Sequence, residues 1–276
     1  MTATKFSDIA HTVVLVGAGK MGGAMLESWI GLGLDPKHVA VIEPQPADAV
    51  RVLAARGLRL NPPMDKIGDA SAILIAVKPQ VAAEAVPPLA KLAGSSTLVV
   101  SIMAGKTLAF LERALPQAAI VRAMPNTPAA IGRGITVAVA NARVSVSQRN
   151  LAHRLLAATG SVEWVDDESL MDAVTAISGS GPAYVFLLAE SLTRAGIAAG
   201  LPAELAAKLA RETIAGSGEL LHRSPLDPAT LRQNVTSPGG TTAAALEVLM
   251  AAADGLDPLL AKAIAAAAKR SRELAG

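Results

Sequence analysis

The sequence predicts an α/β fold in which a doubly wound parallel sheet is followed by an all-helical domain. Up to residue 165, short runs rich in Val, Ile and Ala alternate with helical stretches, which is the order that builds a parallel sheet. After residue 165 no strand-like alternation returns, and the chain continues as one Ala-rich helical stretch after another. We therefore predict two domains, one over residues 1–165 and one over residues 166–276.

The predicted strands are continuous apolar runs, as expected of strands that are buried on both faces of a sheet. They lie at residues 11–16, 39–43, 72–77, 97–102, 120–124, 135–140 and 162–165. Most are separated by helical stretches, with helices expected at residues 21–32, 47–56 and 81–92. Because strands and helices alternate, we expect the strands to be parallel.

Prolines mark the helix starts of the second domain. Asp227 precedes Pro228 and Asp257 precedes Pro258, which is the pattern of an N-cap followed by proline at the first helical position, and Pro202 opens another helix. The helices, such as one over residues 259–275, carry more apolar surface than about 110 residues bury alone. We therefore expect a homodimer, or a multiple of dimers, formed through these helices.

The composition restricts the possible partners. Of 276 residues 51% are hydrophobic but only 2% are aromatic, and the net charge is +2. With few rings for base stacking and no dense Lys/Arg run, we expect no nucleic-acid partner. No apolar run is long enough to span a bilayer and no secretory signal is found, so we expect a cytoplasmic protein without a membrane partner. Zero cysteines and four scattered histidines predict no metal site.

A glycine motif follows the first predicted strand and opens the first predicted helix. Gly17 permits a tight turn, Gly19 lets a pyrophosphate approach the backbone, and Gly22 lets helix and strand pack closely. This context favours a Rossmann-type dinucleotide-binding domain. The alternative is a glycine-rich turn that binds nothing.

Glu43 ends the second predicted strand, about 20 residues past the motif, where an acidic side chain hydrogen-bonds the adenine ribose. Its charge would repel a 2′-phosphate, which favours NADH over NADPH. In the alternative interpretation, Glu43 is only a surface charge, and Lys20 or Arg51 binds a phosphate.

Two later strands end in polar residues at the carboxyl edge of the sheet, where doubly wound folds bind ligands. Lys78 follows one strand and either reaches the cofactor or is a solvated charge. Asn126 and Thr127 follow another and lie between two prolines, which predicts a stiff loop suited to a nicotinamide.

The stretch Ser237–Thr242, SPGGTT, leads directly into an apolar helical run. Thr241 and Thr242 can cap that helix, which is the simpler interpretation. The backbone N–H groups at the helix N-terminus can also bind an anion such as a carboxylate. The small residues of Ser178–Gly181 allow either close helix packing or close approach of a cofactor.

Taken together, the stretches GAGKMGGAM, AVKPQ, RAMPNTPAAIGRG, AISGSGPAYVF and QNVTSPGGTTAAALEVL resemble the pyrroline-5-carboxylate reductase family in order and spacing. The resemblance runs from end to end, and the last stretch is its most specific part. It implies hydride transfer from NAD(P)H to the C=N bond of 1-pyrroline-5-carboxylate, which gives L-proline in the last step of proline synthesis. It also implies that the SPGGTT loop receives the substrate carboxylate.

The resemblance assigns site residues position by position. The implied cofactor site consists of Gly17, Ala18, Gly19, Lys20, Met21, Gly22, Glu43, Pro44, Ala76, Val77, Lys78, Pro79, Ala104, Gly105, Asn126 and Thr127. The implied substrate site consists of Glu168, Asn234, Ser237, Gly239, Gly240, Thr241 and Thr242. Thr242 is the candidate catalytic residue, with a hydroxyl that hydrogen-bonds the imine nitrogen or its proton. The alternative for Thr242 is a cap and carboxylate ligand only.

The chain departs from the family at Glu43, where a Ser or Thr is common, and at Pro63, where an Asn is common. Both changes put NADPH preference in doubt. Two rival functions are a 3-hydroxyacid dehydrogenase and a non-enzymatic nucleotide-binding scaffold. The first is disfavoured because no lysine lies between Lys106 and Lys208, where those enzymes carry a catalytic lysine. The second is disfavoured because a scaffold has no need of a carboxylate-binding loop.

Overall fold

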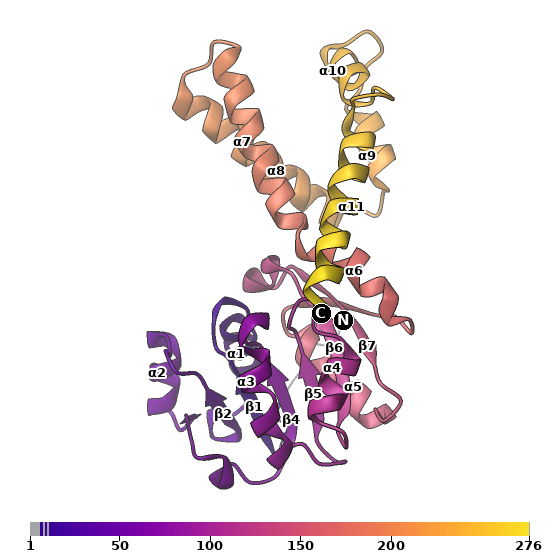
Figure 1. Ribbon diagram of the computed structural model, residues 1–276. Helices are drawn as coiled ribbons and strands as arrows, with labels where there is room; N and C mark the ends of the chain where they lie inside the picture. Colours follow the sequence, from indigo (N-terminus) through magenta and orange to yellow (C-terminus); the bar gives the residue numbers. More distant parts are fainter. Residues whose placement is uncertain (1–5, 8, 10, 276) are drawn as a thin grey trace. The chain divides into compact units, whose positions relative to one another are not determined.

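The computed structural model describes residues 6, 7, 9 and 11–275; the remainder of the predicted domains, at residues 1–5, 8, 10 and 276, lies outside the described residues. The chain forms two compact units (Figure 1). The sheet unit runs to Gly179 and includes the residues from Ala268 on, and the helical unit is Ser180–Ala267.

The sheet unit contains one eight-stranded sheet with the strand order β3-β2-β1-β4-β5-β6-β7-β8. The strands are β1 (Thr12–Val16), β2 (Val39–Ile42), β3 (Arg59–Leu60), β4 (Ala70–Ile75), β5 (Leu98–Ser101), β6 (Ala119–Met124), β7 (Gly134–Ala140) and β8 (Gly160–Trp164). The strand order reverses between β1 and β4, so the crevice for a ligand is expected there, at the carboxyl ends of the strands.

Two features of the sheet differ from the prediction. β7 is antiparallel to β6, although every other neighbouring pair is parallel. The β6–β7 connection contains only the short 3-10 helix η5 (Thr127–Ile131), and a parallel crossover needs a longer connection. β3 was not expected, because two residues are too few to show strand periodicity.

Helices pack on both faces of the sheet. On one face the core includes Met25, Leu26 and Trp29 of α1 (Lys20–Gly31) and Leu155 and Leu156 of α5 (Val146–Ala157). A second core cluster lies on the other face of the sheet, where the alternate strand residues pack under α3 (Ala82–Ala85), η4 (Pro87–Lys91) and α4 (Leu108–Ala114). Besides η5, the remaining helical elements of the sheet unit are η1 (Pro36–His38), α2 (Asp48–Ala55), η2 (Met64–Lys66), η3 (Pro79–Val81), η6 (Glu168–Leu170), α6 (Met171–Val174) and the π-helix η7 (Thr175–Gly179).

The single helix expected over residues 81–92 is wrong. The segment is a short α3 between the 3-10 turns η3 and η4. Pro87 and Pro88 explain the break, because proline lacks an N–H and its ring clashes with the preceding turn.

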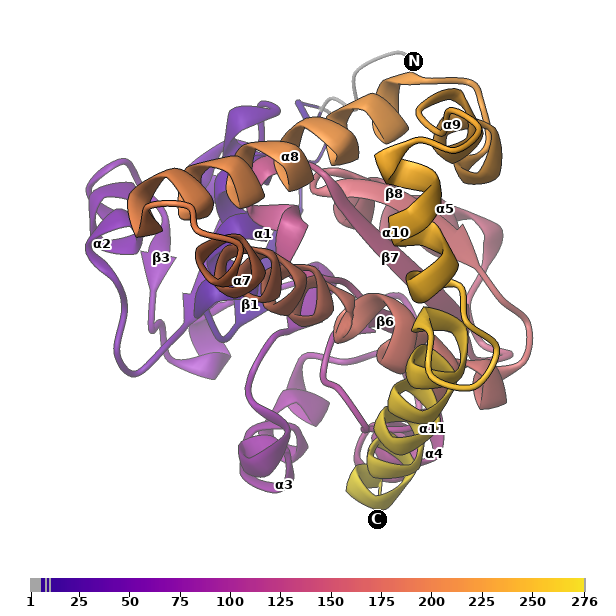
Figure 2. The ribbon, with the colours of Figure 1, turned by 90° about the horizontal axis from the view of Figure 1, so that it is seen from above.

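The helical unit contains α7 (Gly181–Ala198), α8 (Ala203–Arg223), α9 (Pro228–Asn234), α10 (Thr241–Leu249) and the first part of α11 (Leu256–Ala275). α7 and α8 lie side by side as a hairpin (Figure 2). The chain reverses between them at Gly200, whose φ of +97° favours glycine. The expected Asp227 cap of a helix beginning at Pro228 is confirmed. The same expectation for Asp257 is wrong, because α11 already begins at Leu256 and Asp257 lies inside its first turn. No helix in the described part of the chain is long and apolar enough to cross a membrane.

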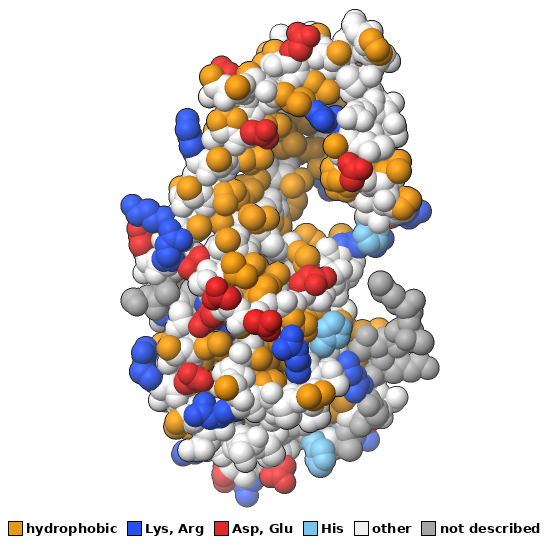
Figure 3. Space-filling model, turned by 90° about the vertical axis from the view of Figure 1, so that its right-hand side faces the viewer, with side chains coloured by type: hydrophobic (Ala, Val, Ile, Leu, Met, Phe, Trp, Pro, Cys, Tyr) orange, Lys and Arg blue, Asp and Glu red, His pale blue; other side chains and the backbone are white. Residues whose placement is uncertain are grey.

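The helical unit buries few of its own apolar side chains. Among its described residues, the buried hydrophobic side chains are those of Ala206 and Ala210, whereas Phe186 and Leu220 are 63% and 56% exposed. Figure 3 shows hydrophobic side chains gathered over these helices. A unit that exposes so much apolar surface is typical of one that associates with another protein surface.

The sheet unit extends beyond the predicted boundary at residue 165. The segment after β8 packs at the carboxyl edge of the sheet, where Gly179 lies against the side chain of Met124. The end of α11 returns to the same unit: the Ser271 hydroxyl donates a 2.6 Å hydrogen bond to Asp172, and Leu274 packs against Gly105. These contacts join residues far apart in the sequence, so local patterns do not reveal them.

Candidate cofactor and substrate site

The predicted glycine turn joins β1 to α1. Gly17 has a φ of +90°, and a Cβ there would lie 2.8 Å from the carbonyl group of Ala76. A Cβ on Gly22 would collide with the carbonyl oxygen of Gly17. Around Gly19, in contrast, no atom lies within 4 Å of an added Cβ. Two of the glycines are therefore required for close packing, and the third leaves space above the turn.

A cavity of about 1050 Å³ lies at this turn, which is ample for a dinucleotide. Its lining comes from the glycine turn, α1, the β2–α2 connection, the end of β4 and α3. α1 begins at Lys20 with Gly19 as its N-cap, without a side-chain cap and without an acidic residue in its first turn, so its N-terminus is open to an anion. The residues present fit a bound dinucleotide.

The structure brings together nine of the predicted cofactor residues in this lining. They are Gly17, Ala18, Gly19, Lys20, Glu43, Pro44, Ala76, Val77 and Lys78. The other predicted cofactor residues do not line the cavity, and they are Met21, Gly22, Pro79, Ala104, Gly105, Asn126 and Thr127. Gly22 instead supports the turn, and Met21 packs against the core.

Sequence reasoning missed the apolar walls of the cavity. They include Ile42, Val50, Val81, Ala85 and Ala130. Such apolar residues carry no motif, and only the fold reveals that they face the same space.

Glu43 follows β2 and points toward the glycine turn. Its carboxylate accepts a 2.8 Å hydrogen bond from the Ala18 N–H and a 2.9 Å hydrogen bond from the Gln45 N–H. A carboxylate oxygen has room for more than one donor, so ribose hydroxyls can still be bound. Of the alternative phosphate ligands, Lys20 lines the cavity, whereas Arg51 lies outside its lining and is 4.0 Å from Asp48.

The loop after β6 is fixed by its own side chain. The side-chain amide oxygen of Asn126 accepts a 3.0 Å hydrogen bond from the Ile135 N–H at the start of β7. Thr127 is exposed at the start of η5. Neighbouring Ala130 reaches the cavity. The expected stiffness of this loop therefore has a second cause besides the two prolines.

In the helical unit, the predicted substrate loop is a tight turn. The Gly240 N–H donates to the Ser237 carbonyl at 3.0 Å, and Gly239 has a φ of +66°. With Pro238 in the second position and Gly239 in the third, this is a type II turn. Pro and Gly at these positions explain why the sequence folds this way.

α10 begins directly after the turn, and Gly240 is its N-cap. The expectation that Thr241 or Thr242 caps the helix is wrong, because no side-chain cap is made and both residues lie inside the first helical turn. The first N–H groups of a helix have no intrahelical acceptor. No acceptor within the described residues bonds the N–H groups of Thr241 and Thr242, so they are available to an anion.

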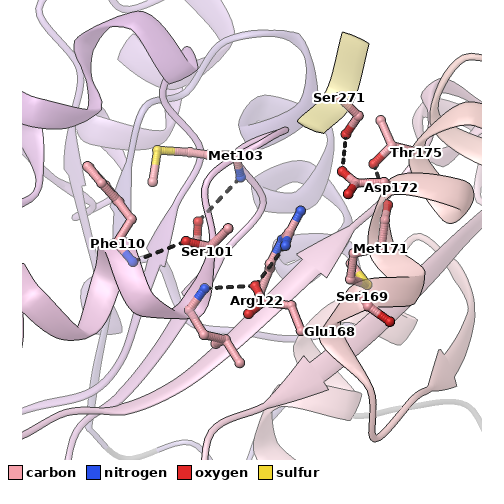
Figure 4. Close-up of polar contacts among 12 residues, drawn as sticks. Ser101, Met103, Phe110, Arg122, Glu168, Ser169, Met171, Asp172, Thr175 and Ser271 are labelled. Atoms are coloured by element: carbon pink, nitrogen blue, oxygen red, sulfur yellow. Dashed lines mark hydrogen bonds and ion pairs between the residues drawn. The ribbon is translucent and has the colours of Figure 1, made fainter. Parts of the chain in front are cut away.

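The two other predicted substrate residues lie in different units. Asn234 is exposed at the end of α9, in the helical unit. Glu168 lies in the sheet unit, where its carboxylate accepts hydrogen bonds from Arg122 at 2.7 Å and from the Leu108 N–H at 2.8 Å (Figure 4). Glu168 thus has a visible structural role at the N-terminus of α4.

The pKa values of two capping aspartates are lowered. The Asp227 carboxylate accepts hydrogen bonds from the Thr230 hydroxyl, the Thr230 N–H and the Ala229 N–H, and these donors lower its pKa. The Ser169 hydroxyl and N–H likewise lower the pKa of Asp167. Both groups are structural caps.

Comparison with known proteins decides the family. The family model described as pyrroline-5-carboxylate reductase dimerisation matches residues 168–274, and the model described as NADP oxidoreductase coenzyme F420-dependent matches residues 12–105. The chain is 41% identical to the pyrroline-5-carboxylate reductase of Synechocystis over 264 residues, which cover 94% of this chain and 97% of that protein. The chain belongs to the pyrroline-5-carboxylate reductase family. The enzyme of that name from Pseudomonas aeruginosa is 37% identical and covers 95% of this chain and 96% of its own length.

Solved structures of pyrroline-5-carboxylate reductases share the fold. The one from Coxiella burnetii superposes with a TM-score of 0.87 at 33% identity and covers 96% of this chain and 99% of its own. The Plasmodium falciparum enzyme, solved with NADP bound, has a TM-score of 0.81 at 28% identity and covers 97% of this chain and 99% of its own. The α/β fold with a helical C-terminal part and the expected family resemblance are both confirmed.

Proposed function

We propose that this protein reduces 1-pyrroline-5-carboxylate to L-proline with a nicotinamide dinucleotide as hydride donor. The observation that carries the proposal is the type II turn at Ser237–Gly240 followed by the open N-terminus of α10, in a chain of this family. A carboxylate is the anion that such a substrate brings, and free N–H groups at a helix N-terminus bind it well.

The residues of this chain chiefly hold and orient the reactants. The bound dinucleotide supplies the hydride, and the protonated imine is already electrophilic, so positioning contributes most to the rate. Thr241 and Thr242 anchor the carboxylate through their N–H groups, since the Gly240 N–H is already bonded within the turn. The Thr242 hydroxyl hydrogen-bonds the imine nitrogen or its proton. The cavity at the glycine turn binds the adenosine and pyrophosphate parts of the cofactor.

We propose that NADH is preferred over NADPH. Glu43 is held at the cavity by the Ala18 N–H, where its charge opposes a 2′-phosphate. The alternative is that Lys20, which also lines the cavity, binds that phosphate.

The 3-hydroxyacid dehydrogenase alternative is less favoured. The segment after Gly181 carries no lysine before Lys208, so the general acid or base that such alcohol chemistry uses is missing from α7.

The test is to follow NADH and NADPH oxidation by the purified protein with 1-pyrroline-5-carboxylate and, as a control, with a 3-oxoacid. Imine-dependent turnover supports the reductase. Turnover with the oxoacid alone would refute it, and turnover with neither would leave a cofactor-binding scaffold as the better description.

We also propose that two copies associate through the helical unit. The support is the exposed apolar surface of α7 and α8, on which Phe186, Leu205 and Leu209 are all exposed. Light scattering at micromolar concentration should give at least twice the chain mass, and Leu209→Glu should reduce it. A monomeric mass for the unmodified protein would refute association.

A further inference from the structure

Asn61 has a backbone conformation that is uncommon for a residue other than glycine. Its φ is +48°, and among the described residues it is the one non-glycine with a positive φ. Asparagine adopts this left-handed region more readily than most residues, and a residue held there is often part of a functional arrangement. Asn61 follows β3 at the edge of the sheet.

The side-chain amide of Asn61 binds both backbone groups of Glu43. Its carbonyl oxygen accepts a 2.8 Å hydrogen bond from the Glu43 N–H, and its NH₂ group donates a 2.9 Å hydrogen bond to the Glu43 carbonyl. The Asn61 N–H also donates to the Val41 carbonyl at 2.7 Å. The amide therefore replaces the strand residue that would otherwise pair with Glu43.

This replacement matters because β2 ends at Ile42, one residue before Glu43. The pairing of β2 with β3 is short and stops at Val41 and Leu60. On the other side, the Gly17 N–H donates to the Ile42 carbonyl at 2.9 Å. The chain at Glu43 is thus held between the glycine turn and Asn61.

Charge discrimination requires that the carboxylate stay in place. A partly exposed carboxylate on a loose backbone can turn into solvent and relieve its repulsion of a phosphate, because exposed charges are well screened. A carboxylate fixed beside the Ala18 N–H cannot turn away without losing that hydrogen bond.

We propose that Asn61 is a positioning residue for cofactor selection: its amide fixes Glu43, and the fixed carboxylate selects a dinucleotide without a 2′-phosphate. This inference rests on the proposed role of Glu43. It goes further by assigning the discrimination to a residue that lies outside the lining of the cavity.

The experiment measures the dissociation constants of NADH and NADPH by calorimetry on the full chain without imine. The main variant is Asn61→Gly, because glycine keeps the positive φ and removes only the amide. We expect the NADH constant to rise, the NADPH constant to stay equal or fall, and the ratio of NADPH to NADH constants to drop about tenfold, as for one charge-assisted hydrogen bond. Asn61→Ala should lower the ratio as much and also lower the melting temperature.

Two controls separate selection from stability. Asn141 makes the same kind of bridge, with its amide bonded to the Ile120 N–H and the Ala118 carbonyl, in a part of the sheet unit outside the cavity lining. Asn141→Ala should lower the melting temperature and leave the ratio unchanged. Glu43→Gln keeps the size of the side chain and removes its charge, and should bring the ratio close to one.

The outcomes distinguish the two proposals. An unchanged ratio in Asn61→Gly, together with a collapsed ratio in Glu43→Gln, would overturn the inference and leave the role of Glu43 intact. A wild-type protein that binds NADPH more tightly than NADH would overturn both. A lowered ratio in both variants, with Asn141→Ala unchanged, supports the inference.

Discussion

The guanidinium of Arg122 lies 2.7 Å from the carboxylate of Glu168, and this ion pair joins β6 to the segment that follows β8. The Arg122 side chain is only 6% exposed and that of Glu168 is 28% exposed. The pair thus holds the segment after β8 against the carboxyl edge of the sheet.

Arg122→Met should lower the free energy of unfolding by about 3 kcal/mol, because removal of one partner leaves a partly buried charge unpaired. Urea unfolding followed by circular dichroism measures the change. Arg194→Met is the matched control, since Arg194 pairs with Glu190 on the surface, where exposed pairs contribute at most about 1 kcal/mol. Equal losses in the two variants would contradict the structural role of Arg122.

Substitution of two glycines in the turn should have different effects. Gly22→Ala places a Cβ against the Gly17 carbonyl and should destabilise the fold by about 1–3 kcal/mol. Gly19→Ala meets no protein atom, so it should keep the melting temperature and weaken dinucleotide binding about tenfold or more by occupying the space above the turn. Calorimetric titration with the cofactor measures the difference, and normal binding by Gly19→Ala would show that the cofactor lies elsewhere.

Thr242→Ala should lower kcat by about 100-fold, the lower end of the effect of a positioned proton donor, while cofactor affinity stays the same. Because Thr242 does not cap α10, the loss cannot be attributed to a lost cap. Steady-state kinetics with the imine test this, and Thr242→Ser should restore most of the rate by restoring the hydroxyl. Wild-type turnover in Thr242→Ala would leave Thr242 as a carboxylate ligand only.

The Asp227 cap should contribute a pH-dependent part of the stability. Since hydrogen bonds lower its pKa in the folded state, the unfolded state binds more protons in the acidic range. The contribution is present above the ordinary pKa of Asp and is lost as the pH falls through the lowered value. Asp227→Asn keeps a good cap without the titration. Its melting temperature should therefore fall less than that of wild type between about pH 7 and pH 3; parallel curves would contradict this.

The strand-turn-helix at Gly17 was predictable from sequence because glycine spacing and strand hydrophobicity agree there. The antiparallel β7 could have been inferred from the short connection through η5, and the break at Pro87 from the prolines themselves. The return of α11 to the sheet unit could not have been inferred from the sequence, because it depends on contacts between distant residues such as Ser271 and Asp172.

In the candidate site, the sequence motifs identified the backbone segments that face the cavity but not the apolar side chains that line it. Glycines leave a sequence signature because the turn tolerates few other residues, whereas Val81 and Ala85 could face any apolar environment. Asn61 had only a weak sequence signal, an asparagine before Pro62, and its importance follows from its φ and its two hydrogen bonds to Glu43.

The return of α11 also affects how the chain folds during synthesis. The ribosome makes the whole helical unit before Ala268, so the sheet unit waits for its final contacts, those of Ser271 and Leu274, until that unit has emerged. A nascent chain stalled just before Ala268 should therefore expose the loop at Gly105 to protease. Once the residues from Ala268 on have been made and the chain has left the ribosome, this loop should be protected.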